Sequence, residues 1–210
     1  MTEMSSGEYF YPNKMGRIVL LAMEEILGHN GINAVLNLSK QSHLINHYPP
    51  NTLDREFEFS LVSKMMGAME DIYGPLGGRG LALRSGRACF KYGLREFGPS
   101  LGITDLAFRL LPLQTKIRDG SDLFAKTINQ ASAQRVRVEE AEDHLFFHIE
   151  QCPVCWQRSA DAPVCHLIVG TLQDALYWVS GGKFFHVEET FCIARGDPAC
   201  SIYIDRNPIE

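Results

Sequence analysis

The strongest constraint on the fold is a change in the spacing of apolar residues that occurs after residue 131 of the chain. Before it, apolar residues recur every three or four positions, which predicts helices over residues 13–28, 31–42, 57–73, 83–97 and 103–131. After it, apolar and polar residues alternate in 136–138, 145–149, 185–193 and 202–204, which predicts strands, with one helix over 164–180 between them. This order predicts an α+β fold, with helices packed on an antiparallel sheet of about four strands.

Glycine and proline mark the expected breaks between these elements. Gly28 is expected to end the first helix, and Gly98-Pro99 the helix over 83–97, while Pro112 and Gly120 are expected to break or kink the helix over 103–131. We expect a flexible N-terminus over 1–12, a helical part over 13–130 and a sheet part over 131–210. The last two are expected to share one core and to form one domain.

Composition excludes several classes of function. The net charge is −5 and basic residues form no block, which argues against nucleic acid as a partner. No apolar run approaches the roughly 20 residues that span a bilayer, and the first residues lack the pattern of a signal peptide. We therefore expect a cytoplasmic protein, in which the 6 cysteines stay reduced and serve metal binding, redox chemistry or burial.

Three of the cysteines are spaced as metal ligands. Cys192 and Cys200 flank a predicted turn over 195–198, so a hairpin brings their sulfur atoms close together. Cys165 lies at the predicted start of a helix, where the helix dipole favours a thiolate. Cys152 and Cys155 form a second pair, which could join Cys192 and Cys200 as ligands or act as a redox pair.

An acidic residue is a candidate fourth ligand. Glu189 shares a predicted strand face with Phe185, Val187, Phe191 and Ile193, where a carboxylate is costly unless it is paired or bound to a cation. It lies three positions from Cys192, so a regular strand points the two side chains to opposite faces, and only a bulge brings them together. Glu188 is the alternative, because it shares a face with Cys192.

One motif resembles a known family. The run Pro163-Val164-Cys165-His166, followed by Gly170 and by Val187-x-Glu189-x-x-Cys192-x-Ala194-x-Gly196-Asp197-x-x-Cys200, resembles the 4-vinyl-reductase-type domain. That domain also serves as the sensing module of phenol-responsive regulators and is related in fold to TRAPP subunits. The resemblance implies a structural zinc ion held by Cys165, Glu189, Cys192 and Cys200, because four protein ligands leave no position for water. It also implies a pocket for a hydrophobic molecule.

The expected function is therefore the binding of a hydrophobic, aromatic or tetrapyrrole-like molecule by a zinc-containing carrier, sensor or accessory factor, as a homodimer. The candidate pocket residues are bulky and lie near the predicted seam between helices and sheet: Phe108, Leu111, Phe147, Trp156 and Trp178. No catalytic motif is visible, so an enzyme is the weaker reading. The alternatives are a reductase or accessory subunit that acts on the vinyl group of a chlorophyll precursor, and an assembly or tethering scaffold.

Overall fold

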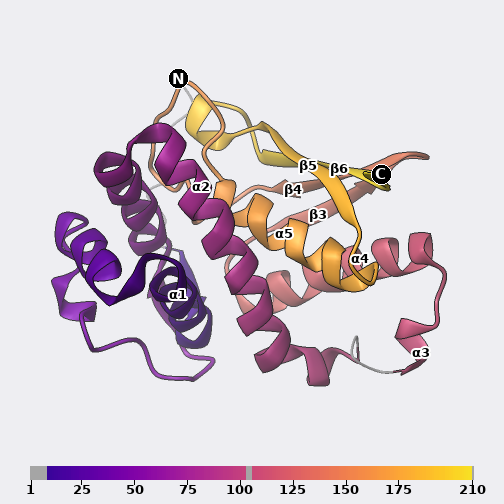
Figure 1. The fold of residues 1–210 in the computed structure, drawn as a ribbon, viewed down its shortest axis with the longest axis horizontal. Helices are drawn as coiled ribbons and strands as arrows, with labels where there is room; N and C mark the ends of the chain where they lie inside the picture. Colours follow the sequence, from indigo (N-terminus) through magenta and orange to yellow (C-terminus); the bar gives the residue numbers. More distant parts are fainter. Residues whose placement is uncertain (1–8, 103–105, 210) are drawn as a thin grey trace.

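The computed structural model describes residues 9–102 and 106–209. Figure 1 shows the helices of the first part on one side of a twisted sheet that the C-terminal part builds. The helices are α1 (Asn13–Leu38), α2 (Phe59–Leu101), α3 (Leu106–Arg109), α4 (Leu113–Ala131) and α5 (His166–Val179), with short 3₁₀ turns at Ser42–Leu44 and Ile193–Arg195. The strands are β1 (Phe10–Pro12), β2 (Arg55–Glu58), β3 (Val136–Glu140), β4 (His144–Ile149), β5 (Phe184–Phe191) and β6 (Cys200–Ile209).

The larger sheet confirms the predicted α+β class. Its 4 strands are antiparallel in the order β3-β4-β6-β5, and a second sheet pairs only β1 with β2. Side chains alternate across the larger sheet, so that Leu145, Phe147 and Ile149 of β4 are buried while His144 and Phe146 lie on the opposite face. Helices α4 and α5 cover the buried face (Figure 1). A single hydrophobic core contains residues of α1, α2, α4, α5 and the sheet.

Each of the two long helices, α1 and α2, is interrupted by a kink at a glycine. Gly28 in α1 and Gly74 in α2 have non-helical backbone angles, with φ of 71° and 73°, so each long helix consists of two helical segments that meet at a kink, and the expected end of the first helix at Gly28 is confirmed. A positive φ is easily adopted only by glycine, which explains both kinks. The expected end at Gly98-Pro99 is wrong, because α2 runs to Leu101. Gly120 lies inside an unbroken α4.

Helices α2 and α5 cross with their backbones in direct contact. A Cβ atom at Gly86 would lie 2.0 Å from the carbonyl oxygen of Leu167, and one at Gly170 would lie 2.1 Å from the carbonyl oxygen of Leu83. Both positions therefore accept only glycine at this separation. The hydroxyl of Thr171 donates a hydrogen bond to the carbonyl oxygen of Gly86 at 3.1 Å, which joins the two helices at the same point.

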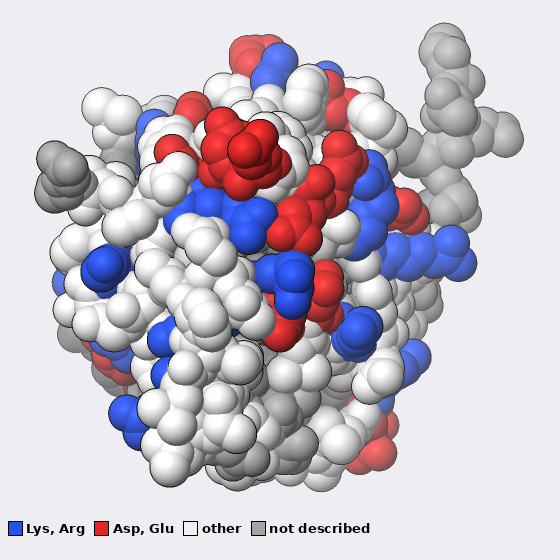
Figure 2. All heavy atoms as spheres, turned by 90° about the vertical axis from the view of Figure 1, so that its right-hand side faces the viewer, with Lys and Arg blue, Asp and Glu red and all other residues white. Residues whose placement is uncertain are grey.

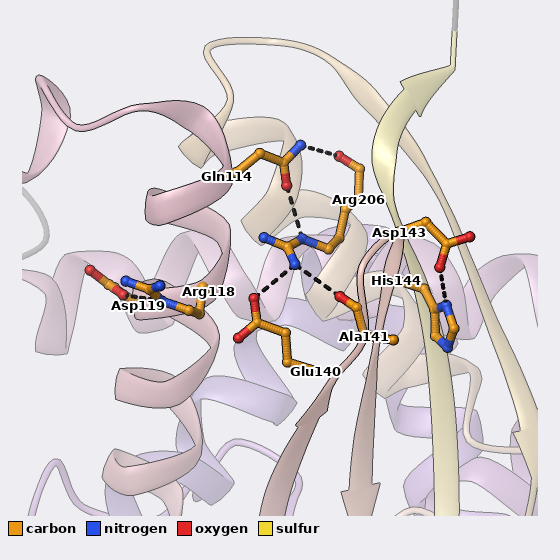
Figure 3. A network of polar contacts seen from close by, with 8 residues as sticks. All are labelled: Gln114, Arg118, Asp119, Glu140, Ala141, Asp143, His144 and Arg206. Atoms are coloured by element: carbon orange, nitrogen blue, oxygen red, sulfur yellow. Dashed lines mark hydrogen bonds and ion pairs between the residues drawn. The ribbon is translucent and has the colours of Figure 1, made fainter.

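Arg206 of β6 ties the first turns of α4 to the end of the sheet (Figure 3). Its guanidinium donates hydrogen bonds to Glu140 at 2.7 Å, to the carbonyl oxygen of Ala141 at 3.0 Å and to the side-chain oxygen of Gln114 at 2.9 Å. The Gln114 amide donates in return to the backbone oxygen of Arg206 at 3.0 Å. This network fixes one end of α4, which lines the cleft described below.

The surface carries both signs of charge. On the face drawn in Figure 2, acidic and basic side chains lie next to one another over the upper part, and the lower part is largely uncharged. Among the residues that the structure describes, no helix combines the length and the apolarity needed to cross a membrane.

Candidate functional site: a buried thiol cluster and an apolar cleft

Five cysteines from four separate segments meet in the core beside the start of α5. Cys152 and Cys155 come from the loop between β4 and α5, and Cys165 is the residue that precedes the first turn of α5. Cys192 follows β5, and Cys200 is the first residue of β6. Each of these side chains is 0% exposed. All five are free thiols, and we call them, together with Glu189, the thiol cluster.

The sulfur atoms lie close together without forming disulfides. The distance from Sγ of Cys165 is 3.4 Å to Cys152, 3.9 Å to Cys192 and 3.6 Å to Cys200. The sulfur atom of Cys200 lies 3.4 Å from that of Cys155 and 3.9 Å from that of Cys192. These separations are far longer than the roughly 2.05 Å of a disulfide bond. They are instead the spacing of thiolates around a tetrahedral metal ion.

Glu189 rather than Glu188 reaches the thiol cluster. Glu189 is 5% exposed, and its Oε2 accepts a hydrogen bond from the backbone N–H of Cys165 at 2.6 Å. Its Oε1 is buried and has no hydrogen-bond partner among the described residues. Burial raises the pKa of this carboxyl, and the hydrogen bond from Cys165 opposes that rise. Glu188 points outward and contacts His186.

A bulge at the end of β5 makes this arrangement possible. The pairing of β5 with β6 shifts register between Glu189 and Phe191, so the side chains after the shift change faces. Glu189 and Cys192 consequently lie on the same side although they are three positions apart. The expectation that Phe191 shares the apolar face is wrong for the same reason, since Phe191 is 51% exposed.

The loop after β5 is held by hydrogen bonds to the cluster residues. The backbone N–H of Cys192 donates to Oδ2 of Asp197 at 2.8 Å, and the backbone N–H of Ile193 donates to Sγ of Cys200 at 3.4 Å. Such contacts fix the direction of ligand side chains and offset negative charge on sulfur. Gly196 turns the chain with φ of 95°. The motif Gly196-Asp197 thus has a structural role in this loop.

Two cavities with residues of α5 in their walls are almost entirely apolar. Cavity A has a volume of about 80 Å³ and lies between α2, α4, α5 and β6. Cavity B has a volume of about 160 Å³ and lies between α1, α2, α4 and α5. Phe90 and Phe124 line both cavities, so two aromatic rings separate them. Their other main apolar walls are Met15, Ile18, Phe97, Ile117, Leu172, Leu176 and Val179.

A wider groove of about 470 Å³ adjoins cavity A at the surface. It shares Phe108, Lys116, Trp178 and Val179 with cavity A, and Arg109 lines it as well. Two cationic side chains therefore stand beside an apolar cavity. We refer to cavities A and B and the groove together as the cleft.

The expected pocket residues fall in three places. Phe108 and Trp178 line cavity A and the groove. Phe147 is 1% exposed and packs in the core against Phe124, with ring centroids 5.8 Å apart. Trp156 packs against Tyr9 and Phe59 at the N-terminal end of α2, and Leu111 lies in the loop before α4; neither is among the residues that line the cleft.

Comparison with known proteins identifies the fold. No family model and no curated protein matches the chain. Solved structures match over nearly all of it. An H-NOX protein studied for heme distortion has a TM-score of 0.60 at 13% identity and covers 95% of this chain and 97% of its own. A ferrous, unliganded H-NOX protein from K. algicida has a TM-score of 0.57 at 12% identity, covering 95% and 97%. The chain has the H-NOX fold.

A third match supports the same conclusion. An oxygen-binding H-NOX domain related to soluble guanylate cyclases has a TM-score of 0.54 at 13% identity and covers 92% of this chain and 94% of its own. Identities this low establish the fold alone.

These matches overturn two expectations. The resemblance to the 4-vinyl-reductase-type domain and to TRAPP subunits is wrong, because the matching structures are H-NOX domains. The vinyl-reductase and tethering alternatives were based on that resemblance and fall with it. Structural zinc as the cofactor is also wrong, since the proteins that share the fold are described by heme and iron.

Proposed function

We propose that this protein binds a small apolar molecule that carries an anionic group, and that it works as a sensor or carrier of that molecule. The observation that carries the proposal is the position of Lys116 and Arg109 at the surface end of an otherwise apolar cleft. The likeness to oxygen-binding H-NOX domains supports a role in small-molecule binding.

The cavities favour an apolar ligand of one or two rings. Their walls are aromatic and aliphatic, so a ligand gains free energy from leaving water, at roughly 25 cal/mol per Å² of apolar surface. A dry cavity of about 150 Å³ is large enough to bind benzene. Cavity B, of about 160 Å³, is therefore of the size for a single ring, whereas cavity A, of about 80 Å³, is smaller and adjoins the groove of about 470 Å³.

The two cations favour a negative group at the surface end. Among the described residues, neither Arg109 nor Lys116 forms an ion pair with a carboxylate. Lys116 is half-buried in the first turns of α4, where its charge is less screened than on an open surface. A carboxylate or sulfonate attached to an aromatic ring held by cavity A and the adjoining groove could reach it without being buried.

The residues of the cleft do not fit the heme of the H-NOX proteins. Among the described residues, the walls of cavities A and B and of the groove include no histidine to hold iron. Cys89 and Tyr11 line cavity B, but burial raises the pKa of the Cys89 thiol to about 12 and that of Tyr11 as well, which keeps both neutral. The Tyr11 hydroxyl already donates to Gln134 at 2.7 Å.

Both cavities are also smaller than the roughly 300–1,000 Å³ of a drug-sized site. We therefore propose neither heme nor another tetrapyrrole as the ligand.

The test uses two fluorescent probes with the same aromatic body. 1-Anilinonaphthalene-8-sulfonate carries an anionic group, and N-phenyl-1-naphthylamine lacks it. We expect saturable binding of both to the native protein, with one molecule per chain and tighter binding of the sulfonate. If neither probe bound saturably to the folded protein, the proposal would be contradicted.

Replacement of Lys116 by glutamine should separate the two contributions. The sulfonate probe is expected to bind about 3- to 10-fold more weakly, because a partly shielded ion pair contributes roughly 1 kcal/mol. The affinity for the neutral probe should stay the same. Lys126→Gln, on the same helix but away from the cleft, is the matched control and should change neither affinity. Equal weakening of both probes by Lys116→Gln would show that the charge has no direct role.

The homodimer and the cytoplasmic location expected from the sequence stay predictions. Sedimentation of the purified chain over a range of concentrations measures the first.

A further inference from the structure

The thiol cluster contains two groups of four ligand atoms. Within each group, all ligand atoms lie within 4.8 Å of one another. The first group is Cys152, Cys155, Cys165 and Cys200, and the second is Cys165, Glu189, Cys192 and Cys200. Cys165 and Cys200 belong to both groups.

The distances fit two tetrahedra that share one edge. A metal–thiolate bond of about 2.3 Å places two thiolates of a tetrahedral site about 3.8 Å apart. The shared edge, from Cys165 to Cys200, measures 3.6 Å. Sγ of Cys192 lies 3.9 Å from both sulfur atoms of this edge. Sγ of Cys152 lies 3.4 Å from that of Cys165, and Sγ of Cys155 lies 3.4 Å from that of Cys200.

We propose that the thiol cluster binds two divalent metal ions, with Cys165 and Cys200 as bridging thiolates. Cys152 and Cys155 complete one tetrahedron, and Glu189 and Cys192 complete the other. The ions are thiophilic first-row transition metals other than the zinc expected from the sequence, because soft sulfur ligands in tetrahedral arrangement select such metals. This site differs from the one expected from the sequence, because it holds two ions instead of one and adds Cys152 and Cys155 to the ligands.

The unpaired oxygen of Glu189 supports the second position. Oε1 of Glu189 is buried without a hydrogen-bond partner among the described residues, in a side chain that is only 5% exposed. A buried carboxylate oxygen is costly unless it is paired or coordinates a metal. A single ion among the four cysteines of the first group leaves this oxygen unpaired, whereas an ion in the second group gives it a ligand role.

The charges of the proposed site also balance more closely with two ions. Five thiolates and one carboxylate carry six negative charges, of which two divalent ions neutralise four. The N-terminus of α5 and the N–H groups of Cys165 and Ile193 face the remainder. With one ion, the same six groups would have to bury four negative charges or stay partly protonated.

The experiment is a titration of the full chain with cobalt(II) after metal removal under reducing conditions. Tetrahedral Co²⁺–thiolate sites absorb in the visible and near ultraviolet, so the absorbance reports the number of ions bound. We expect the absorbance to rise up to two Co²⁺ per chain. Magnetic susceptibility should fall as the second ion binds, because bridging thiolates couple the two spins. Metal analysis of the protein as purified should likewise give two ions per chain.

Variants distinguish the two positions. Cys152→Ser/Cys155→Ser and Glu189→Gln/Cys192→Ser should each bind one Co²⁺ with an unperturbed magnetic moment, and Cys89→Ser, which lies outside the cluster, should still bind two. Circular dichroism shows whether each variant is folded. If a variant does not fold, the number of Co²⁺ ions bound by the native protein decides the question. One Co²⁺ per native chain, no binding, disulfides among the five cysteines, or iron with acid-labile sulfide would each overturn the proposal.

Discussion

Replacement of Gly170 by alanine is expected to lower the free energy of unfolding by about 1–3 kcal/mol, as overpacking at a close contact does. The new methyl group would lie 2.1 Å from the carbonyl oxygen of Leu83, and this backbone atom cannot move without shifting α2. The helix propensity of alanine, which favours the substitution by about 1 kcal/mol, is too small to compensate. The melting temperature should fall by roughly 3–10 °C for a chain of this size. Gly86→Ala should have a similar effect, because its Cβ meets Leu167 in the same way.

Gly67→Ala is the matched control for both variants. Gly67 also lies inside α2, but a Cβ atom there has nothing within 4 Å. Its melting temperature should be unchanged or slightly higher. If Gly170→Ala were as stable as Gly67→Ala, helices α2 and α5 would not cross as closely as the structure shows. The position of α5 as a wall of the cleft would then also be incorrect.

Replacement of Gly120 by leucine is expected to reduce the affinity for both naphthalene probes at least tenfold without unfolding the protein. Gly120 lies in α4 on the wall of cavity A, and a Cβ atom there would be 3.6 Å from the ring of Phe108, which is ordinary contact. The leucine side chain would therefore extend into the cavity and take the place of the ligand. A tenfold loss corresponds to about 1.4 kcal/mol of binding free energy.

The stability of this variant is part of the prediction. Leucine should stabilise α4 relative to glycine by roughly 0.5–1 kcal/mol, so weaker binding cannot be attributed to unfolding. Gly80→Leu is the control, since Gly80 lies in α2 outside the cleft and a Cβ atom there has nothing within 4 Å. Full affinity in Gly120→Leu would place the probe elsewhere on the protein.

Local sequence patterns were enough to predict the fold class. The alternation of Leu145, Phe147 and Ile149 and the helical spacing over 164–180 are repeated signals, and the structure confirms the antiparallel sheet and α5. The ends of the long helices were harder to predict. Gly28 is a strong stop signal and the helix does break there, whereas Gly98-Pro99 does not end α2, which runs to Leu101.

The candidate site was only partly visible in the sequence. The spacing of Cys192 and Cys200 indicated a hairpin that brings them together, and the structure contains it. The approach of Cys152 and Cys155 to the same point depends on the path of a loop between β4 and α5, which no periodic pattern describes. The walls of the cleft come from five helices and two strands, so only the assembled fold could show that Phe90 and Phe124 line both of its cavities.

The most direct test of the ligand-binding account is a nuclear Overhauser measurement on the native protein with methyl-labelled isoleucine, leucine and valine, saturated with the sulfonate probe. Ile117 is 1% exposed and Leu176 is 5% exposed, and both line cavity A. We expect magnetisation transfer from the naphthalene protons to the methyl groups of these two residues. Transfer only to methyl groups outside the cleft, or none at saturation, would contradict it.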